Sequence, residues 1–193
     1  MEHTNRKGDR YFVFEGKTKT GKPKYFVSRK PTSDGGNQIE SLPEAFELFE
    51  DPSSHVVTVR RRKPTRIKQF EADLVRDLAI RLSSHSAVQA LIDGDYIVLY
   101  APDEDSLQLA KDFESMFGSF TSAAKSIVSR GRYTAVMRFK LVDEDQRLYQ
   151  ISRYCFRSSI DGWLSLPSRS APLETLARKY FPHLGEDSFY ELF

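Results

Sequence analysis

The pattern of apolar and polar residues predicts β-structure in the first third of the chain. Residues 10–16 and 24–30 are rich in aromatic and β-branched side chains, and a lysine-rich loop separates them. This combination predicts a hairpin with a basic tip. A Ser-Asp-Gly-Gly turn at 33–36 and strands near 46–49 and at 55–62 are also expected. Hairpins at this spacing are typical of a small antiparallel meander or half-barrel.

The apolar pattern changes to a helical period after this β-rich part. Between Thr65 and about Ser83, apolar residues recur every three or four positions, which predicts one face of an amphipathic helix: Ile67, Phe70, Leu74, Leu78 and Leu82. Pro64 disfavours helical backbone for the residue before it, and Thr65 is a suitable N-cap. We therefore expect this helix to begin at Thr65.

The rest of the chain alternates between the two periods. We first expect a hairpin of 87–92 and 95–100 around Asp93-Gly94, and then a helix from the acidic run 103–105 through about Phe120. Gly118 either ends this helix or interrupts it before a continuation to Ile127. The remaining elements are a hairpin of 132–142 and 147–157 with a loop at 143–146, a short strand at 162–167, and a helix from Ser170 to Phe181-Pro182.

This order of elements predicts an α+β fold. An N-terminal antiparallel β-meander or half-barrel would pack on an α-β-β-α-β-β-α part with its own antiparallel sheet. The strand-to-helix junction divides the chain into a β subdomain, 1–63, and an α+β subdomain, 64–193. Because no flexible linker separates them, we expect the two subdomains to pack as one unit.

Composition narrows the class of protein. The chain has 193 residues, of which 39% are hydrophobic, and this is enough apolar material for a folded core. Its single cysteine, Cys155, excludes an internal disulfide and fits a reducing compartment. The first residues are polar and the longest apolar runs are about six residues, so neither a secretory signal nor a membrane span is expected. We therefore expect a soluble, cytoplasmic protein.

The net charge of +2 is uninformative, but its distribution is uneven. Residues 55–69 hold six cations and no carboxylate: Arg60, Arg61, Arg62, Lys63, Arg66 and Lys68. Arg66 and Lys68 would lie in the first turn of the predicted helix, where the positive helix end disfavours cations unless an anion binds there. The other interpretation is a solvated corner, or one neutralised by the acidic block at 40–51.

A second basic surface is predicted on the 132–157 hairpin. With a loop at 143–146, strand alternation places seven residues on one face: Arg138, Lys140, Arg147, Tyr149, Ile151, Arg153 and Arg157. The core face would then include Met137, Phe139 and Tyr154. Arginines beside a tyrosine on an open sheet are typical of single-stranded nucleic-acid platforms, although they are also ordinary on an outer face. One extra loop residue would change this assignment.

No catalytic or metal-binding motif is present. The four histidines have no zinc-type spacing, and no P-loop, dinucleotide fingerprint or nucleophile elbow occurs. We therefore predict no catalytic residue, no metal and no cofactor. An enzyme whose site is assembled from distant residues is kept as the third hypothesis.

The chain closes with the aromatic sequence GEDSFYELF. Phe189, Leu192 and Phe193 would either dock on the core as a short helix or be offered to a partner's groove. The leading hypothesis is thus a non-enzymatic protein that binds nucleic acid or another polyanion. The alternative is a protein-interaction or assembly module that uses the N-terminal sheet or this aromatic tail.

Overall fold

The computed structural model describes residues 1–85, 87–117, 121–157 and 160–192. The chain forms two compact units, Met1–Arg62 and Lys63–Phe193. The division lies one residue before the predicted boundary. The predicted α+β class, with antiparallel sheets and an N-terminal all-β part, is confirmed.

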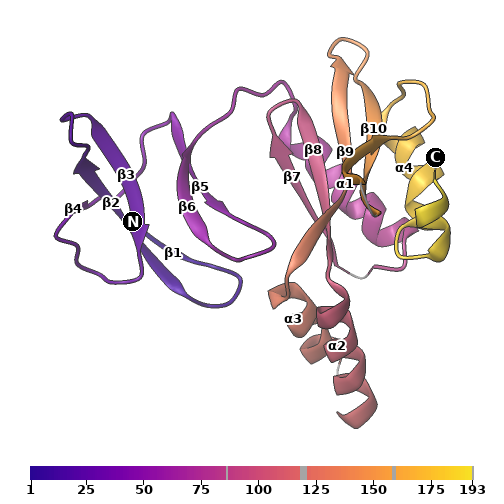
Figure 1. The fold of residues 1–193 in the computed structure, drawn as a ribbon, viewed down its shortest axis with the longest axis horizontal. Helices are drawn as coiled ribbons and strands as arrows, with labels where there is room; N and C mark the ends of the chain where they lie inside the picture. Colours follow the sequence, from indigo (N-terminus) through magenta and orange to yellow (C-terminus); the bar gives the residue numbers. More distant parts are fainter. Residues whose placement is uncertain (86, 118–120, 158–159, 193) are drawn as a thin grey trace. The chain divides into compact units, whose positions relative to one another are not determined.

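The first unit is built around one central strand, β2 (Figure 1). Strand β3 pairs along one edge of β2, while β1 and β4 pair with successive parts of the other edge, all antiparallel. A separate two-stranded hairpin follows. The strands are β1 (Glu2–Thr4), β2 (Arg10–Lys17), β3 (Pro23–Ser28), β4 (Gly36–Gln38), β5 (Phe46–Glu50) and β6 (Val57–Arg61).

Strand β2 is buried on both faces. Four consecutive residues, Tyr11 to Phe14, are at most 8% exposed, so β2 needs apolar partners above and below it. Phe14 stacks on Phe26 of β3, with 5.5 Å between the ring centroids. On β3, Tyr25 packs against Phe46 of the β5–β6 hairpin at 4.8 Å. These ring contacts join the hairpin to the sheet.

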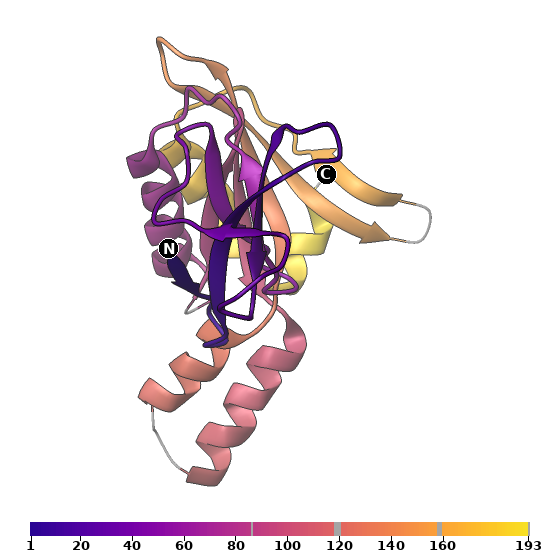
Figure 2. The same ribbon diagram turned by 90° about the vertical axis from the view of Figure 1, so that its left-hand side faces the viewer.

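The second unit contains a five-stranded antiparallel sheet in the order β11-β10-β9-β8-β7. Helices α1 and α4 contact each other and lie on one face of this sheet (Figure 2). The elements are α1 (Gln69–Leu82), β7 (Gln89–Asp93), β8 (Tyr96–Pro102), α2 (Glu104–Phe117), α3 (Thr121–Arg130), β9 (Tyr133–Asp143), β10 (Leu148–Arg157), β11 (Ile160–Ser165), α4 (Leu173–Tyr180), and the 3₁₀ turns η1 (Phe181–His183) and η2 (Asp187–Glu191).

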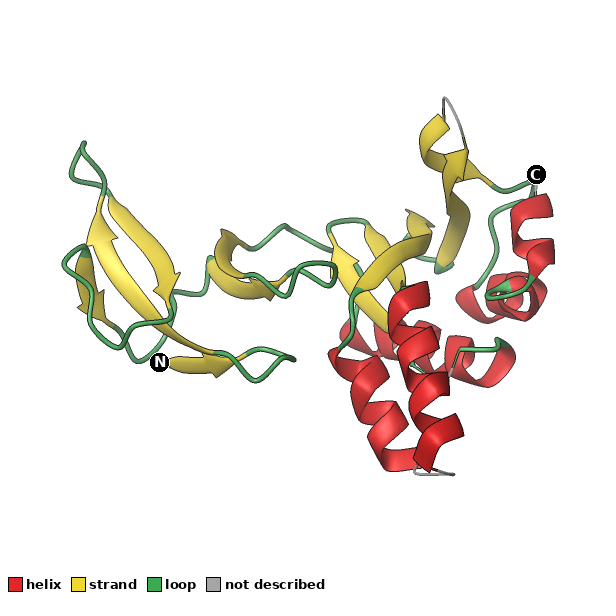
Figure 3. Ribbon diagram, turned by 60° about the horizontal axis from the view of Figure 1, so that its bottom comes forward, coloured by secondary structure: helices red, strands yellow, loops and turns green. Residues whose placement is uncertain are grey.

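The core of the second unit lies between the sheet and these two helices. Alternate residues of the central strands point into it, including Ile97, Leu99, Met137 and Phe139, none of which is exposed. Helices α2 and α3 connect β8 to β9 along the chain and pack against each other. They extend away from the end of the sheet (Figures 1 and 3). Only one face of the sheet is therefore covered by helices of the described residues.

Two local predictions need correction. Helix α1 begins at Gln69 rather than Thr65, and Phe70, which was predicted to face the core, is 66% exposed. The tight turn between β7 and β8 is Gly94-Asp95, one residue later than predicted. Gly94 has φ of 61°, and glycine at the first central position is typical of a type II′ turn.

No helix among the described residues is long and apolar enough to cross a membrane.

Candidate nucleic-acid interface

The basic corner at residues 60–62 is partly neutralised within the first unit. Arg60 Nε lies 2.8 Å from Glu47 Oε1, and its guanidinium lies 3.8 Å from the Phe49 ring centroid. Glu47 belongs to the acidic block at 40–51, so this block does neutralise part of the positive charge at the corner. Arg62 Nε donates to the Phe46 carbonyl at 3.2 Å, while Arg61 lies 5.3 Å from the Phe46 ring. A role for Arg61 and Arg62 in anion binding stays a prediction.

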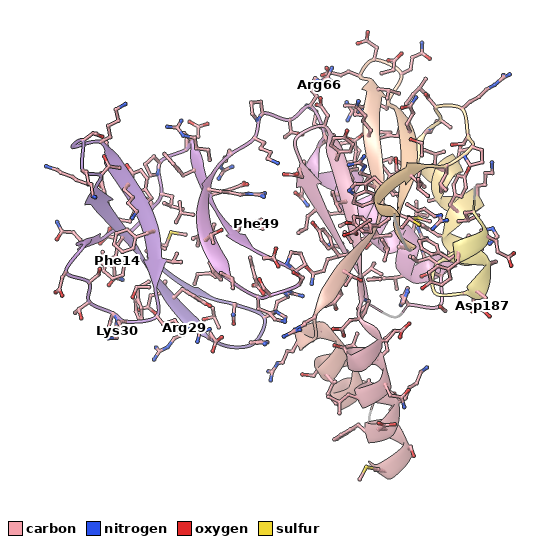
Figure 4. All side chains as sticks on the ribbon, viewed as in Figure 1. Phe14, Arg29, Lys30, Phe49, Arg66 and Asp187 are labelled. Atoms are coloured by element: carbon pink, nitrogen blue, oxygen red, sulfur yellow. The ribbon has the colours of Figure 1, made fainter. Side chains whose placement is uncertain are left out.

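The next two cations bind hairpin ends within the second unit. Lys63 Nζ lies 2.7 Å from Asp93, beside the β7–β8 turn. Arg66 lies 3.4 Å from Asp95 and 3.6 Å from Glu144, and Figure 4 shows it at the end of the sheet. These pairs are well exposed, so each contributes little to stability. They do, however, lower the positive charge that the corner offers to a ligand.

The predicted helix start, on which the anion-site hypothesis was based, was wrong, while anion binding by Arg66 and Lys68 stays a prediction. Because residues 63–68 are not helical, Arg66 precedes the helix and Lys68 occupies its N-cap. The Lys68 backbone N–H donates to Glu71 Oε2 at 2.8 Å, so a carboxylate of the chain already lies at this helix end. The Thr65 hydroxyl instead donates to the Gly94 carbonyl at 2.7 Å. The mismatch of charge and dipole inferred from the sequence is thereby removed.

Glu71 is the centre of a buried network. Its carboxylate accepts hydrogen bonds from Tyr149 Oη at 2.7 Å and Arg147 Nε at 2.9 Å, and Arg147 Nη2 binds its second oxygen. Burial alone would raise the pKa of Glu71, but the bonds from Arg147, the Lys68 N–H and Tyr149 outweigh it and lower this pKa. Burial and the Glu71 carboxylate raise the pKa of Tyr149. The network is fully paired, which fits a structural role.

The register of the β9–β10 hairpin also differs from the prediction. Strand β10 starts opposite Asp143, and the pairing then shifts so that Tyr149 lies opposite Leu141 and Arg153 opposite Met137. Arg147, in the loop, has φ of 50°. This irregularity turns the β10 side chains from Tyr149 to Cys155 to the face opposite the one predicted. Tyr149, Ile151 and Arg153 therefore lie on the core face. The side chain of Arg157, which was predicted on the basic face, lies outside the described residues.

Arg153 is consequently not part of a basic surface. It is 3% exposed, and its guanidinium donates to the carbonyls of Leu192 at 2.8 Å and Tyr190 at 3.3 Å. Phe189 is 7% exposed and Leu192 packs against the same core, so these two tail residues are docked. Phe193 lies outside the described residues. If the C-terminal tail bound in the groove of a partner, Phe189 would have to leave the core.

A groove of about 610 Å³ lies beside the docked segment, between the start of β9 and the end of β10. Its lining includes Arg153, which is already hydrogen-bonded, and the carboxylates Asp187 and Glu191. Two carboxylates in a groove repel an anionic ligand. This groove is therefore a poor site for a polyanion.

The opposite face of the sheet carries a different arrangement. Arg138 of β9 lies between two aromatic rings, 4.7 Å from the Tyr96 centroid and 4.5 Å from that of Trp163. Lys140, which is exposed, lies 5.9 Å from Tyr96. Tyr154 packs edge-on against Trp163 at 5.0 Å. We name these five residues the aromatic–cationic cluster.

The register of the sheet explains how residues of β8, β9, β10 and the edge strand β11 come together in this cluster. Tyr96 lies opposite Lys140, and Val98 lies opposite Arg138. Tyr154 lies opposite Trp163 on β11. Directly paired residues point to the same face, so the cluster crosses from β8 to β11 on the side away from α1 and α4.

Arg138 has unused hydrogen-bonding capacity. Within the described part of the chain it forms no salt bridge, and its Nε is buried without a hydrogen-bond partner. A guanidinium between two rings gains cation–π energy but keeps its N–H donors, which bind phosphate well. Nearby, Tyr154 donates to Asp161 Oδ1 at 2.9 Å, and this bond raises the pKa of the phenol.

The structure thus separates the predicted site residues. Arg138 and Lys140 lie together, whereas Arg153 lies on the other face. Sequence reasoning missed Tyr96 and Trp163 and assigned Tyr154 to the core. Alternation along β10 would have placed Tyr154 with Arg138 if the register had been known.

Other chemistry has little support in the described residues. No three His, Cys, Asp or Glu side chains gather there as a metal site. Cys155 is a buried free thiol. Comparison of the chain with protein-family models, with curated proteins and with solved structures finds no match.

Proposed function

We propose that this protein is a non-enzymatic binder of single-stranded nucleic acid. The aromatic–cationic cluster on the open face of the second unit is the contact surface. One observation carries the proposal: Arg138 lies between Tyr96 and Trp163, with a donor that no group of the described chain uses.

The cluster offers both groups that such a ligand requires. Cations attract phosphates, and aromatic side chains stack on unpaired bases at about 1–3 kcal/mol per base. Stacking on rings of a sheet surface requires bases that are not in a duplex, which favours single strands. Recognition would be independent of sequence, because every base has a π-face. Affinity would fall as salt rises, because cation binding to phosphates releases counterions.

The protein-interaction alternative receives less support from the geometry. The aromatic tail would have to expose Phe189, which is 7% exposed, and free two carbonyls from Arg153. Both changes cost free energy before any partner is bound.

The single tryptophan makes a direct test possible. Trp163 is the only Trp of the chain, so fluorescence excited selectively at tryptophan, and not at the nine tyrosines, reports on the open face. We expect a short oligo(dT) to quench this fluorescence at about 50 mM salt, and quenching to weaken by about 200 mM. A labelled oligonucleotide would give affinities for variants by fluorescence anisotropy.

Two double variants compare the contribution of the aromatic–cationic cluster to binding with that of Lys63 and Arg66. Arg138→Ala with Lys140→Ala should weaken binding about tenfold or more, and Trp163→Ala should have a similar effect. Arg66→Ala with Lys63→Ala removes the same charge from the corner and should change affinity much less. Absence of quenching and binding at low salt would reject the proposal. An equal loss in both double variants would reject the location.

A further inference from the structure

The tip of the β2–β3 hairpin is a second strongly basic feature, and it lies in the first unit. Residues 17–24 read KTKTGKPK, and all four lysines are exposed: Lys17, Lys19, Lys22 and Lys24. None of the four forms a salt bridge with a carboxylate of the described residues. They differ in this respect from Arg60, Lys63 and Arg66.

The backbone of the tip is well ordered by its own hydrogen bonds. The Thr18 N–H donates to the Lys22 carbonyl at 2.8 Å, and the Lys22 N–H donates to the Thr18 hydroxyl at 3.1 Å. Gly21 adopts φ of 78° and donates to the Thr18 carbonyl at 2.9 Å. The loop is therefore pre-organised, and a ligand would not have to order the backbone.

The lysines surround the tip rather than lie on one side. Lys24 pairs with Gly16 and Lys17 with Pro23, so these two lysines project from opposite faces of the hairpin. Lys19 and Lys22 lie in the loop itself, and Figure 3 shows the loop projecting beyond the paired parts of the strands. Positive charge therefore lies on both faces of the hairpin and in its loop.

Acidic groups occur only at the base of the hairpin. Glu15 and Asp34 line an open groove that starts there and reaches Gly21 and Pro23 of the loop. The Glu15 carboxylate accepts a hydrogen bond from Tyr25 at 3.4 Å. These two carboxylates reduce the positive potential on the side of this groove, while residues 17–24 themselves contain no carboxylate.

We infer that this hairpin tip binds the phosphodiester backbone of nucleic acid as a second, sequence-independent contact. The inference rests on the proposed function for the ligand class but on separate residues. An anionic membrane is a less suitable ligand, because surface insertion needs apolar side chains beside the cations. Besides Lys19 and Lys22, the loop between Lys17 and Lys24 contains only threonine, glycine and one proline, so it has no large apolar side chain.

The test compares two variants of the full chain with equal charge. The tip variant carries Lys→Gln at positions 17, 19, 22 and 24. The control carries Lys→Gln at four other exposed lysines, Lys7, Lys30, Lys111 and Lys179. Each lowers the net charge from +2 by four, to −2. The affinity for labelled oligo(dT) is measured across a salt series, and Trp163 quenching is measured at saturation.

We expect the slope of log K against log salt to become shallower by about 2–3 in the tip variant, since each phosphate contact on a single strand contributes about 0.7. The control should change this slope by less than about 1. Trp163 quenching at saturation should persist in both variants. An unchanged slope in the tip variant, or an equal change in both, would overturn the inference.

The two proposals fail in distinguishable ways. If oligo(dT) binds without quenching Trp163 and the tip variant still loses slope, the open face is rejected and the hairpin is supported. If oligo(dT) quenches Trp163 but the tip variant keeps its slope, only the hairpin inference is rejected. Tip-dependent binding to phosphatidylserine vesicles without binding to oligo(dT) would replace nucleic acid with a membrane surface.

Discussion

The arginines on the two faces of the second unit's sheet differ in their partners. On the side of α1 and α4, Arg147 binds Glu71, and Arg153 donates to carbonyls of the C-terminal segment. On the other face, Arg138 lies between Tyr96 and Trp163 without a salt bridge to any described carboxylate. A buried charge must be paired, because desolvation without a partner costs several kcal/mol. On the covered face the guanidinium donors are therefore bound by groups of the chain, whereas on the open face those of Arg138 are left for a ligand.

This comparison predicts that substitutions on the covered side alter stability, whereas those on the open face alter binding. The first two tests below compare one buried group with an exposed counterpart in the same unit.

The largest effect is expected for Glu71→Gln. Glu71 is 4% exposed in its side chain, and its loss of charge leaves Arg147 without its anion. We expect a decrease of about 3 kcal/mol in the free energy of unfolding, measured by urea denaturation. Glu174→Gln, which breaks the exposed Glu174–Arg178 pair, should change it by less than about 0.5 kcal/mol. Similar values for the two variants would contradict a buried network at Glu71.

A smaller effect is expected for Arg153→Met. This change keeps most of the buried volume and removes the donors to the Leu192 and Tyr190 carbonyls. The cost should be about 2 kcal/mol, the range of hydrogen bonds to charged groups. Amide exchange across residues 187–192 should accelerate, while Arg178→Met should leave it unchanged. Unaltered protection of this segment would show that Arg153 does not hold the tail.

The pH dependence of stability follows from the same carboxylate. Because the folded-state pKa of Glu71 lies below its ordinary value of 4.5, its contribution is complete above that value. The contribution is lost as the pH falls through the folded-state pKa. Unfolding free energies measured below pH 4.5 should therefore decrease less steeply in Glu71→Gln than in the parent chain. Parallel curves for the two proteins would contradict the lowered pKa.

The smallest effect on stability is expected for Arg138→Ala. Cation–π contacts contribute from about 0.5–1 kcal/mol at exposed sites to about 2 kcal/mol when desolvated, and Arg138 is half-buried, so the free energy of unfolding should fall by less than about 2 kcal/mol. The fluorescence of Trp163 should shift, because its cationic neighbour is removed. A loss above about 2 kcal/mol would place Arg138 with the buried arginines, as a structural residue. The contrast between the two faces would then disappear.

Local patterns were sufficient for most elements of the fold. The β2–β3 hairpin, the β9–β10 hairpin and α4 lie close to their predicted positions. Errors arose where one residue decides the outcome. The pairing shift at Leu148/Tyr149 inverted the predicted faces of β10, and the non-helical segment before Gln69 placed the start of α1 four residues later than predicted. Neither feature has a local periodic signal.

The candidate site was predictable only in part. Arg138 and Lys140 could be chosen from strand alternation, because both lie on β9, whose faces were assigned correctly. Trp163 and Tyr96 could not, since they come from β11 and β8 and reach Arg138 only through the order of strands in the sheet. Cross-strand neighbours depend on register, which a single sequence leaves open.

The amino-acid sequence by itself determined the periodicities, and with them the α+β class and the basic segments at 17–24 and 60–68. Only the tertiary structure decided which cations have partners. Lys63 and Arg66 are paired by Asp93, Asp95 and Glu144, which come from later hairpins, whereas the hairpin tip and Arg138 have no salt bridge to the described carboxylates. The physical reason is that electrostatic pairing depends on distance in space, and long-range contacts bring together charges that are far apart in the chain.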